Sequence, residues 1–249
     1  MNLETIAVSE SDGIAHIELN RPEKANAFNG TMWQDLRRAF EWLHESSARV
    51  GVLSGRGKHF SAGIDLALLG RLQAEVEGLP AEGRVRKLLA FILDLQHCVG
   101  AIEACHKPVL AAVHGACIGG AVDVITACDM RYATERARFS VKEVDLGIVA
   151  DLGTLQRLPG LIGDGLAREL AYTGREFDGE EARSMRLLNQ AFQDRDTMMT
   201  TVMGLAGTIA GKSPATVRGI KESMNFSRDH SVAEGLSHVA QRNAQKGHG

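Results

Sequence analysis

The sequence lacks most of the features that mark specialised classes of protein. Aromatic residues make up 5% of its 249 residues, and 28 Lys and Arg nearly balance 31 Asp and Glu, which leaves a net charge of -3. No basic field therefore favours binding to nucleic acid. No apolar run approaches the roughly 20 residues that a membrane-spanning helix needs, so we expect no membrane partner.

Cysteine is also scarce, and its spacing argues against two further classes. The four residues, Cys98, Cys105, Cys117 and Cys128, form no C-x-x-C pair and lie in apolar surroundings. Such residues are typical of buried thiols in a reducing compartment, not of disulfides or a zinc site. The nine histidines show no H-E-x-x-H spacing, so no metal site is predicted. The N-terminus has no signal-peptide pattern, and we expect a cytoplasmic protein.

The residues that are present are those of an ordinary globular protein, 44% apolar and 24% charged. Short apolar stretches predict strands at residues 6–8, 14–19, 50–53 and 109–113. Amphipathic spacing predicts helices between them, and the final third shows helical patterns alone. Strands alternating with helices indicate an α/β fold. Residues 70–84 are polar and contain glycine and proline, so we expect a mobile loop there.

A glycine-led segment in the middle of the chain carries the first candidate site. Gly120 begins an almost wholly apolar helix whose one acid is Asp123. A backbone N–H at such a position is a good donor for a developing oxyanion, and the turn at residues 62–65 offers a second donor. Asp123 is equally well explained as a helix-start acid or as a partner for Arg131 or Arg136. The residue types alone leave these alternatives open.

Further acids follow along the chain. Glu143 and Asp145 lie two apart on a predicted extended run, where they would share a face. Asp151 follows the apolar residues 147–150, whose composition is unlike that of a solvated surface loop. Acids usually belong to solvated faces, so composition does not decide which of them is functional. The stretch GTIAGKS at residues 207–213 is one residue short of a phosphate-binding loop, and we interpret it as a helix end.

Together these segments resemble the crotonase (enoyl-CoA hydratase/isomerase) superfamily over nearly the whole chain. The motifs that carry the resemblance are LNRPEKANAFN (19–29), FSAGIDL (60–66), GACIGGAVDVITACDMRYAT (115–134), ADLGTLQRLPGLIG (150–163) and SRDHSVAEGL (227–236). The resemblance implies an α/β spiral of ββα units over residues 1–190. It further implies a C-terminal helical region, residues 191–249, through which the chain assembles as a homotrimer or homohexamer.

Within the superfamily the chain most resembles the Δ3,5-Δ2,4-dienoyl-CoA isomerases, which shift 3,5-dienoyl-CoA to 2,4-dienoyl-CoA in fatty acid β-oxidation. The resemblance implies three catalytic acids, Asp123, Glu143 and Asp151, and an oxyanion hole formed by the amides of Ile64 and Gly120. A proton must leave C2 and another must reach C6, which are too far apart for one carboxylate. Glu143 is assigned to C2 and Asp151 to C6, and the reverse assignment stays open.

The resemblance also implies contacts for an acyl-CoA thioester. The residues expected to bind it are Lys24, Ala25, Ser61, Ala62, Gly63, Ile64, Asp65, Leu66, Ala67 and Ala121. No cofactor is expected, because coenzyme A arrives as part of the substrate. Three alternatives stay open: a 2-enoyl-CoA hydratase in which Asp123 and Glu143 hold a water, a crotonase-fold protein that binds RNA, and a catalytically silent oligomer.

Overall fold

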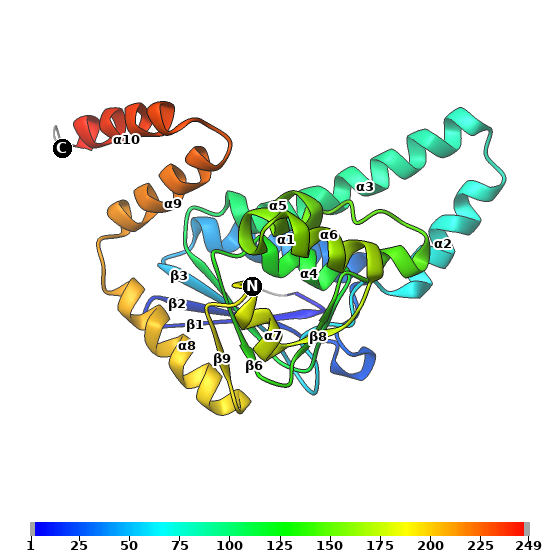
Figure 1. Ribbon diagram of the computed structural model, residues 1–249, viewed down its shortest axis with the longest axis horizontal. Coiled ribbons are helices and arrows are strands. Elements are labelled where there is room, and N and C mark those ends of the chain that lie inside the picture. The colour runs from blue at the N-terminus through cyan, green and yellow to red at the C-terminus, as the bar shows by residue number, and fades with distance from the viewer. Residues whose placement is uncertain (1–2, 247–249) are drawn as a thin grey trace.

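The computed structural model describes residues 3–246 and shows a central sheet with helices on both faces (Figure 1). The strand order is β1-β2-β3-β4-β6-β9; β1 and β2 pair antiparallel, and the other neighbours pair in parallel. These strands are β1 (Ile6–Ser11), β2 (Ile14–Leu19), β3 (Val50–Gly55), β4 (Val109–Val113), β6 (Met130–Thr134) and β9 (Gln190–Phe192). Every residue of β3 and β4 is buried, as expected for parallel strands covered on both faces.

A second, smaller sheet supports the region of the candidate site. It contains β5 (Ala116–Ile118), β7 (Arg138–Ser140) and β8 (Phe177–Asp178), in the order β5-β7-β8. The strand β5 leads directly into α4 (Gly120–Thr126). A bridge between Ser61 and Cys117 joins the turn after β3 to β5. Two segments far apart in the sequence, the 61–65 turn and the start of α4, are therefore held together.

Helices cover the sheet on two sides (Figure 1). On one side, α8 (Arg195–Ala210) buries Met198, Val202 and Ala206 against strand residues. The helices on the other side or around the smaller sheet are α1 (Gly30–Glu45), α3 (Ala81–Ala104), α4, α5 (Thr154–Ile162), α6 (Asp164–Thr173) and α7 (Gly179–Ser184), with a short 3-10 helix η1 (Pro22–Lys24) near the N-terminus. Within the described residues, no helix combines the length and apolarity needed to cross a membrane.

Two helical extensions project from this body in opposite directions (Figure 1). One is the hairpin of α2 (Leu66–Glu77) and the N-terminal part of α3; the other contains α9 (Pro214–Arg228) and α10 (Val232–Lys246). The predicted division of the chain at residue 190 stays a prediction. In the structure, β9 spans that boundary and α8 packs against the central sheet, so the projecting part begins after α8.

The expected mobile loop at residues 70–84 is wrong, because these residues form most of α2 and the start of α3. Only the short link around Gly78 and Pro80 lies outside the two helices. Gly70 lies within α2 on an open face, with no atom within 4 Å of a Cβ placed there. A glycine at such a site weakens a helix by about 1 kcal/mol without ending it.

Two other expectations about local structure are also wrong. Glu143 and Asp145 do not lie on a strand; they belong to the 3-10 helix η2 (Lys142–Leu146), which ends at Gly147 with a φ of 69°. The final third is not helical alone, because it contains β8 and β9. These strands are two and three residues long, too short for a periodic pattern to reveal them.

Candidate active site

The turn at residues 61–65 presents the amide of Ile64. Gly63 has a φ of +87°, and a Cβ on it would lie 2.3 Å from the carbonyl oxygen of Ile118, so only glycine fits. Phe28 N–H donates to the Gly63 carbonyl at 2.7 Å, and Asp65 N–H donates to the Phe28 carbonyl at 3.0 Å. These bonds fix the backbone on both sides of Ile64, and neither of them involves the Ile64 N–H.

Gly120 brings a second amide to the same place. A Cβ on Gly120 would lie 4.0 Å from the Ile64 nitrogen and 3.3 Å from the Trp33 ring, so the two amides are close neighbours beside an aromatic wall. Among residues 3–246, neither the Ile64 N–H nor the Gly120 N–H donates a hydrogen bond. Two adjacent, unpaired N–H groups can both bind one carbonyl oxygen, which is the arrangement of an oxyanion hole.

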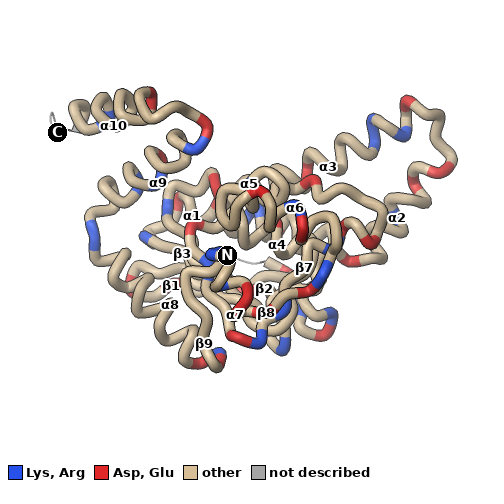
Figure 2. Tube along the Cα trace, viewed as in Figure 1, with Lys and Arg blue, Asp and Glu red and all other residues tan. Residues whose placement is uncertain are grey.

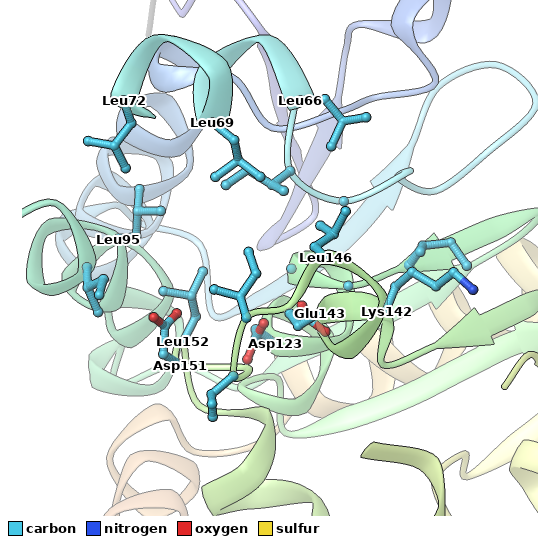
Figure 3. Close-up of a pocket in the computed structure, with 18 of the residues that line it drawn as sticks. Leu66, Leu69, Leu72, Leu95, Asp123, Lys142, Glu143, Leu146, Asp151 and Leu152 are labelled. Carbon is cyan, nitrogen blue, oxygen red and sulfur yellow. The ribbon is translucent and has the colours of Figure 1, made fainter. Parts of the chain in front are cut away.

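A cavity of about 340 Å³ adjoins these amides and contains all three predicted acids (Figure 3). Its walls are mostly apolar. They comprise Leu66, Leu69 and Leu72 of α2, Leu88, Phe91, Ile92 and Leu95 of α3, Ile118, and Leu146, Ile148, Val149 and Leu152 of the segment around η2. Three carboxyl groups in such surroundings have little water to stabilise their charged forms.

Asp123 is the most deeply buried of the three acids, with 1% of its surface exposed. Burial raises the pKa of its carboxyl to about 6, against the opposing effects of Thr154 and of the positive charge of Arg157. Its Oδ1 accepts a 2.6 Å hydrogen bond from the N–H of Thr154, at the start of α5. The alternative in which Arg131 or Arg136 pairs with Asp123 is not seen among residues 3–246: Arg131 donates to the carbonyls of Leu187 and Cys128 instead.

Glu143 has its pKa raised to about 7, first by burial and then by repulsion from the Asp123 carboxylate. Its Oε2 is buried and has no hydrogen-bond partner in the described part of the chain. Its Oε1 lies against Gly119, 3.1 Å from the position where a Cβ would be. This carboxyl therefore faces the cavity beside the Gly120 amide, and it is half protonated near neutral pH.

Asp151 lies in the segment between η2 and α5 and lines the same cavity (Figure 3). It is partly exposed, and burial raises the pKa of its carboxyl above the ordinary value. Its carbonyl oxygen accepts a 2.7 Å hydrogen bond from Nε2 of Gln96 on α3. Acids from three separate elements thus meet at one apolar cavity, and each has a pKa displaced toward the range in which a group both donates and accepts protons.

The residues expected to contact CoA lie in three kinds of place: at the surface, along the cavity and in the interior. Lys24, Asp65 and Ala67 lie on or near the surface, and Ala62, Ile64 and Leu66 line the cavity. The N–H of Ala62 donates to the Ala25 carbonyl at 2.9 Å, so the 21–25 loop lies beside the 61–67 segment. Ser61 and Ala121 are fully buried, and Gly63 is also buried. Ser61 donates to the Asn26 carbonyl and accepts from the Gly63 N–H, so it shapes the turn.

Sequence reasoning missed most of the apolar wall. Leu72 falls in the stretch where a loop is expected, and Leu69 and the four cavity residues of α3 fall where the pattern predicts a helix but no binding role. The spacing of Leu66, Leu69 and Leu72, three residues apart, is the signal of one helix face. Lys142, at the edge of the cavity, was also missed; it pairs with Asp145. No group of three metal-ligating side chains occurs within residues 3–246.

Residues 9–246 match the sequence profile of the enoyl-CoA hydratase/isomerase family. The chain belongs to this family of enzymes, and an acyl-CoA substrate is consistent with that membership. Curated relatives include the proteins named mitochondrial Delta(3,5)-Delta(2,4)-dienoyl-CoA isomerase of Mus musculus and its peroxisomal counterpart of Arabidopsis thaliana. The mouse protein is 43% identical over 96% of this chain and 74% of its own length; the Arabidopsis protein is 44% identical over 97% and 88%.

Solved structures confirm the expected crotonase fold. The crystal structure of an enoyl-CoA hydratase from Bacillus anthracis superposes with a TM-score of 0.87, at 29% identity, covering 99% of this chain and 92% of that one. The expected cytoplasmic location is contradicted, because the relatives are named mitochondrial or peroxisomal. That expectation rested on the absence of a signal-peptide pattern, and an absence does not identify a compartment.

Proposed function

We propose that this enzyme converts 3,5-dienoyl-CoA to 2,4-dienoyl-CoA. The observation that carries the proposal is the meeting of three acids with raised pKa values at one apolar cavity, beside two unpaired amides. Moving the double bonds from positions 3 and 5 to positions 2 and 4 needs one proton transfer at C2 and another at C6, and the chain has an acid for each. The names of the relatives at 43–44% identity support the same reaction.

The reaction begins at the thioester oxygen, which accepts hydrogen bonds from the N–H groups of Ile64 and Gly120. These bonds stabilise negative charge on that oxygen and make the C2 proton acidic. The Glu143 carboxylate removes this proton, and the resulting dienolate takes a proton at C6 from the Asp151 carboxyl. The double bonds then stand at positions 2 and 4. Glu143 loses its proton to water and Asp151 regains one, which restores the starting state.

Asp123 supports this chemistry without a proton transfer of its own. One of its oxygens is occupied by the Thr154 N–H, and its charge raises the pKa of Glu143. A hydratase would need Asp123 and Glu143 to hold a water together, and the Thr154 bond takes up part of the capacity of Asp123. The CoA moiety is proposed to lie along the 21–25 loop and the 61–67 segment, which the ion pair between Arg21 and Asp65 holds together.

The experiment is a spectroscopic assay with 3,5-dienoyl-CoA. Asp151→Asn and Glu143→Gln are each expected to lose about a thousandfold in kcat, because each removes a proton-transfer group. Asp145→Asn is the matched control, since Asp145 lies on η2 near Glu143 but pairs with Lys142 at the surface. Its activity should equal that of the wild type.

Near wild-type isomerisation by Asp151→Asn would contradict the two-acid mechanism. Rapid hydration of crotonyl-CoA without any isomerisation of the dienoyl substrate would show a hydratase instead.

We further infer that the chain assembles as a homotrimer or a dimer of trimers through the region that contains α9 and α10. This region projects from the body and exposes Ile220, Met224, Val232 and Leu236 to solvent in the single chain. Apolar side chains gathered on a projecting part are typical of a subunit interface. Lys and Arg are interspersed with Asp and Glu along the chain (Figure 2), which gives no support to an RNA-binding role.

A further inference from the structure

The segment that carries Asp151 is held by side chains from three helices. Gln96 of α3 donates to the Asp151 carbonyl at 2.7 Å, and Asp123 of α4 accepts from the Thr154 N–H at 2.6 Å. Between these two contacts, Nη1 of Arg157 on α5 donates to the Leu152 carbonyl at 3.3 Å. The backbone from residue 151 to residue 154 is thus fastened at both ends and in the middle.

Arg157 is itself fixed in place. Its Nε and Nη2 both donate to Oε2 of Glu103, at 3.1 and 2.8 Å, and the two side chains are 17% and 24% exposed. A two-bond contact of this kind fixes the plane of a guanidinium, which a lysine cannot reproduce. Glu103 also pairs with Arg228 at the end of α9, so its charge is balanced by two arginines.

The guanidinium of Arg157 lies in close contact with the backbone at Gly153. This residue has a φ of +122°, and a Cβ placed on it would lie 1.8 Å from Nη1 of Arg157. The arginine therefore occupies the space that any other side chain would need. The backbone next to Asp151 follows the surface of Arg157.

Asp151 needs such support because, within residues 3–246, its own side chain has no charged partner. Among the described residues, its pKa is affected by burial and by its own backbone, and no ion pair contributes. The direction of its carboxyl is therefore set by the backbone of its segment. For a proton delivered to one carbon of a bound chain, a misplacement of 1 Å costs about a hundredfold in rate.

We propose that Arg157 is a positioning residue for Asp151: anchored by Glu103, it holds the Leu152 carbonyl and the backbone of Gly153, and so aims the Asp151 carboxyl into the cavity. The proposal rests on the two-acid isomerisation described above. Loss of Arg157 should therefore affect the two proton transfers differently. Removal of the C2 proton depends on Glu143 and the oxyanion hole, whereas delivery at C6 depends on Asp151.

The test compares Arg157→Gln with the wild type in two assays of the full-length enzyme with 3,5-dienoyl-CoA. Isomerisation should fall about a hundredfold in kcat with little change in KM. Exchange of the C2 hydrogens in deuterated water, followed by mass spectrometry, should stay near the wild-type rate. Arg157→Lys should behave like Arg157→Gln if the two-bond geometry matters, and Arg168→Gln, which removes a surface arginine on α6, should change neither assay.

A second comparison uses the Asp151→Asn background. If Arg157 acts through Asp151, adding Arg157→Gln to Asp151→Asn should cause no further loss of isomerisation. A full additional hundredfold loss there, or an equal loss of C2 exchange and isomerisation in the single variant, would overturn the proposal. If Arg157→Gln does not fold, Glu103→Gln carries the same test, because it removes the anchor and keeps the arginine. Wild-type activity of Asp151→Asn would instead overturn the proposed function.

Discussion

At the scale of the residue, the site depends on a carboxyl group in surroundings that disfavour its charge. Burial and the nearby Asp123 raise the pKa of Glu143 to about 7 from an ordinary value of 4.5. The folded protein therefore binds this proton more tightly than the unfolded chain does. Stability from this group is highest at acidic pH and is lost as the pH rises from about 4.5 through 7.

Glu143→Gln should consequently stabilise the protein at alkaline pH. We expect an increase in the free energy of unfolding on the order of 2 kcal/mol at pH 8 and little change at pH 4, where the carboxyl is protonated in both states. Urea unfolding of the wild type and the variant at the two pH values measures this difference. A gain of the same size at both values would mean that ionisation is not the cause. Asp145→Asn again serves as the control, with a change below about 0.5 kcal/mol.

Sequence reasoning reached the acids but not their surroundings. The structure places Asp123, Glu143 and Asp151 at one cavity, whereas their catalytic roles stay predictions. The bond from the Thr154 N–H to Asp123 joins residues 31 positions apart, and nothing in the local pattern indicates it. Arg131 and Arg136 were considered as partners because they are near in sequence; the fold turns Arg131 toward backbone carbonyls of other segments instead.

At the scale of the element, the 61–65 turn lies against the end of β5 and the start of α4, with no room for a side chain at Gly63. Gly63→Ala would place a methyl group 2.3 Å from the Ile118 carbonyl, in a backbone conformation that alanine resists. The two segments must then separate, which moves the Ile64 and Gly120 amides apart. We expect a fall in kcat of at least a hundredfold, as for loss of one oxyanion donor.

The control for this variant is Gly204→Ala. Gly204 lies inside α8, exposed, with no atom within 4 Å of a Cβ placed there. Alanine should stabilise the helix by about 0.5–1 kcal/mol and leave kcat unchanged. Full activity in Gly63→Ala would show that the two amides do not act together.

The α2–α3 hairpin should determine how the enzyme handles the acyl chain. Leu72 lines the cavity from the outer part of α2, away from the three acids (Figure 3). Leu72→Ala removes apolar contact worth about 1 kcal/mol, so KM for a long-chain dienoyl-CoA should rise about fivefold. KM for a short-chain substrate, measured in the same assay, should not change. Equal effects on both substrates would place the acyl chain elsewhere.

The errors in the predicted elements have two physical causes. The hairpin of β1 and β2 and the strands β3 and β4 were predicted because each is at least five residues long and regular in pattern. Strands of two or three residues, such as β8 and β9, form only because a neighbouring strand pairs with them. The expected loop at residues 70–84 is wrong for another reason: this stretch is polar and contains glycine and proline, so its composition resembles that of a loop although it belongs mostly to α2 and α3.

At the scale of the whole molecule, the exposed apolar side chains of α9 and α10 allow us to predict how one added charge changes the proposed assembly. Met224 is 70% exposed in the single chain. Met224→Glu should leave the folded subunit intact and shift the proposed trimer toward the monomer, because a charge buried in an apolar interface is costly. Analytical ultracentrifugation measures the change, and circular dichroism checks the fold. An unchanged mass at all concentrations would place the interface elsewhere. Thr201→Glu, on the exposed face of α8, is the matched control.

The apolar wall of the α2–α3 hairpin also has a consequence for the thermodynamics of binding. Each methylene group of an acyl chain that enters the cavity removes apolar surface of both ligand and protein from water. The heat capacity change of binding should therefore become more negative with each added carbon. Once the acyl chain is longer than the wall formed by α2 and α3, further carbons should leave the heat capacity change of binding unaltered. Titration calorimetry over a series of acyl-CoA lengths would thus measure the length of the cavity in carbon atoms.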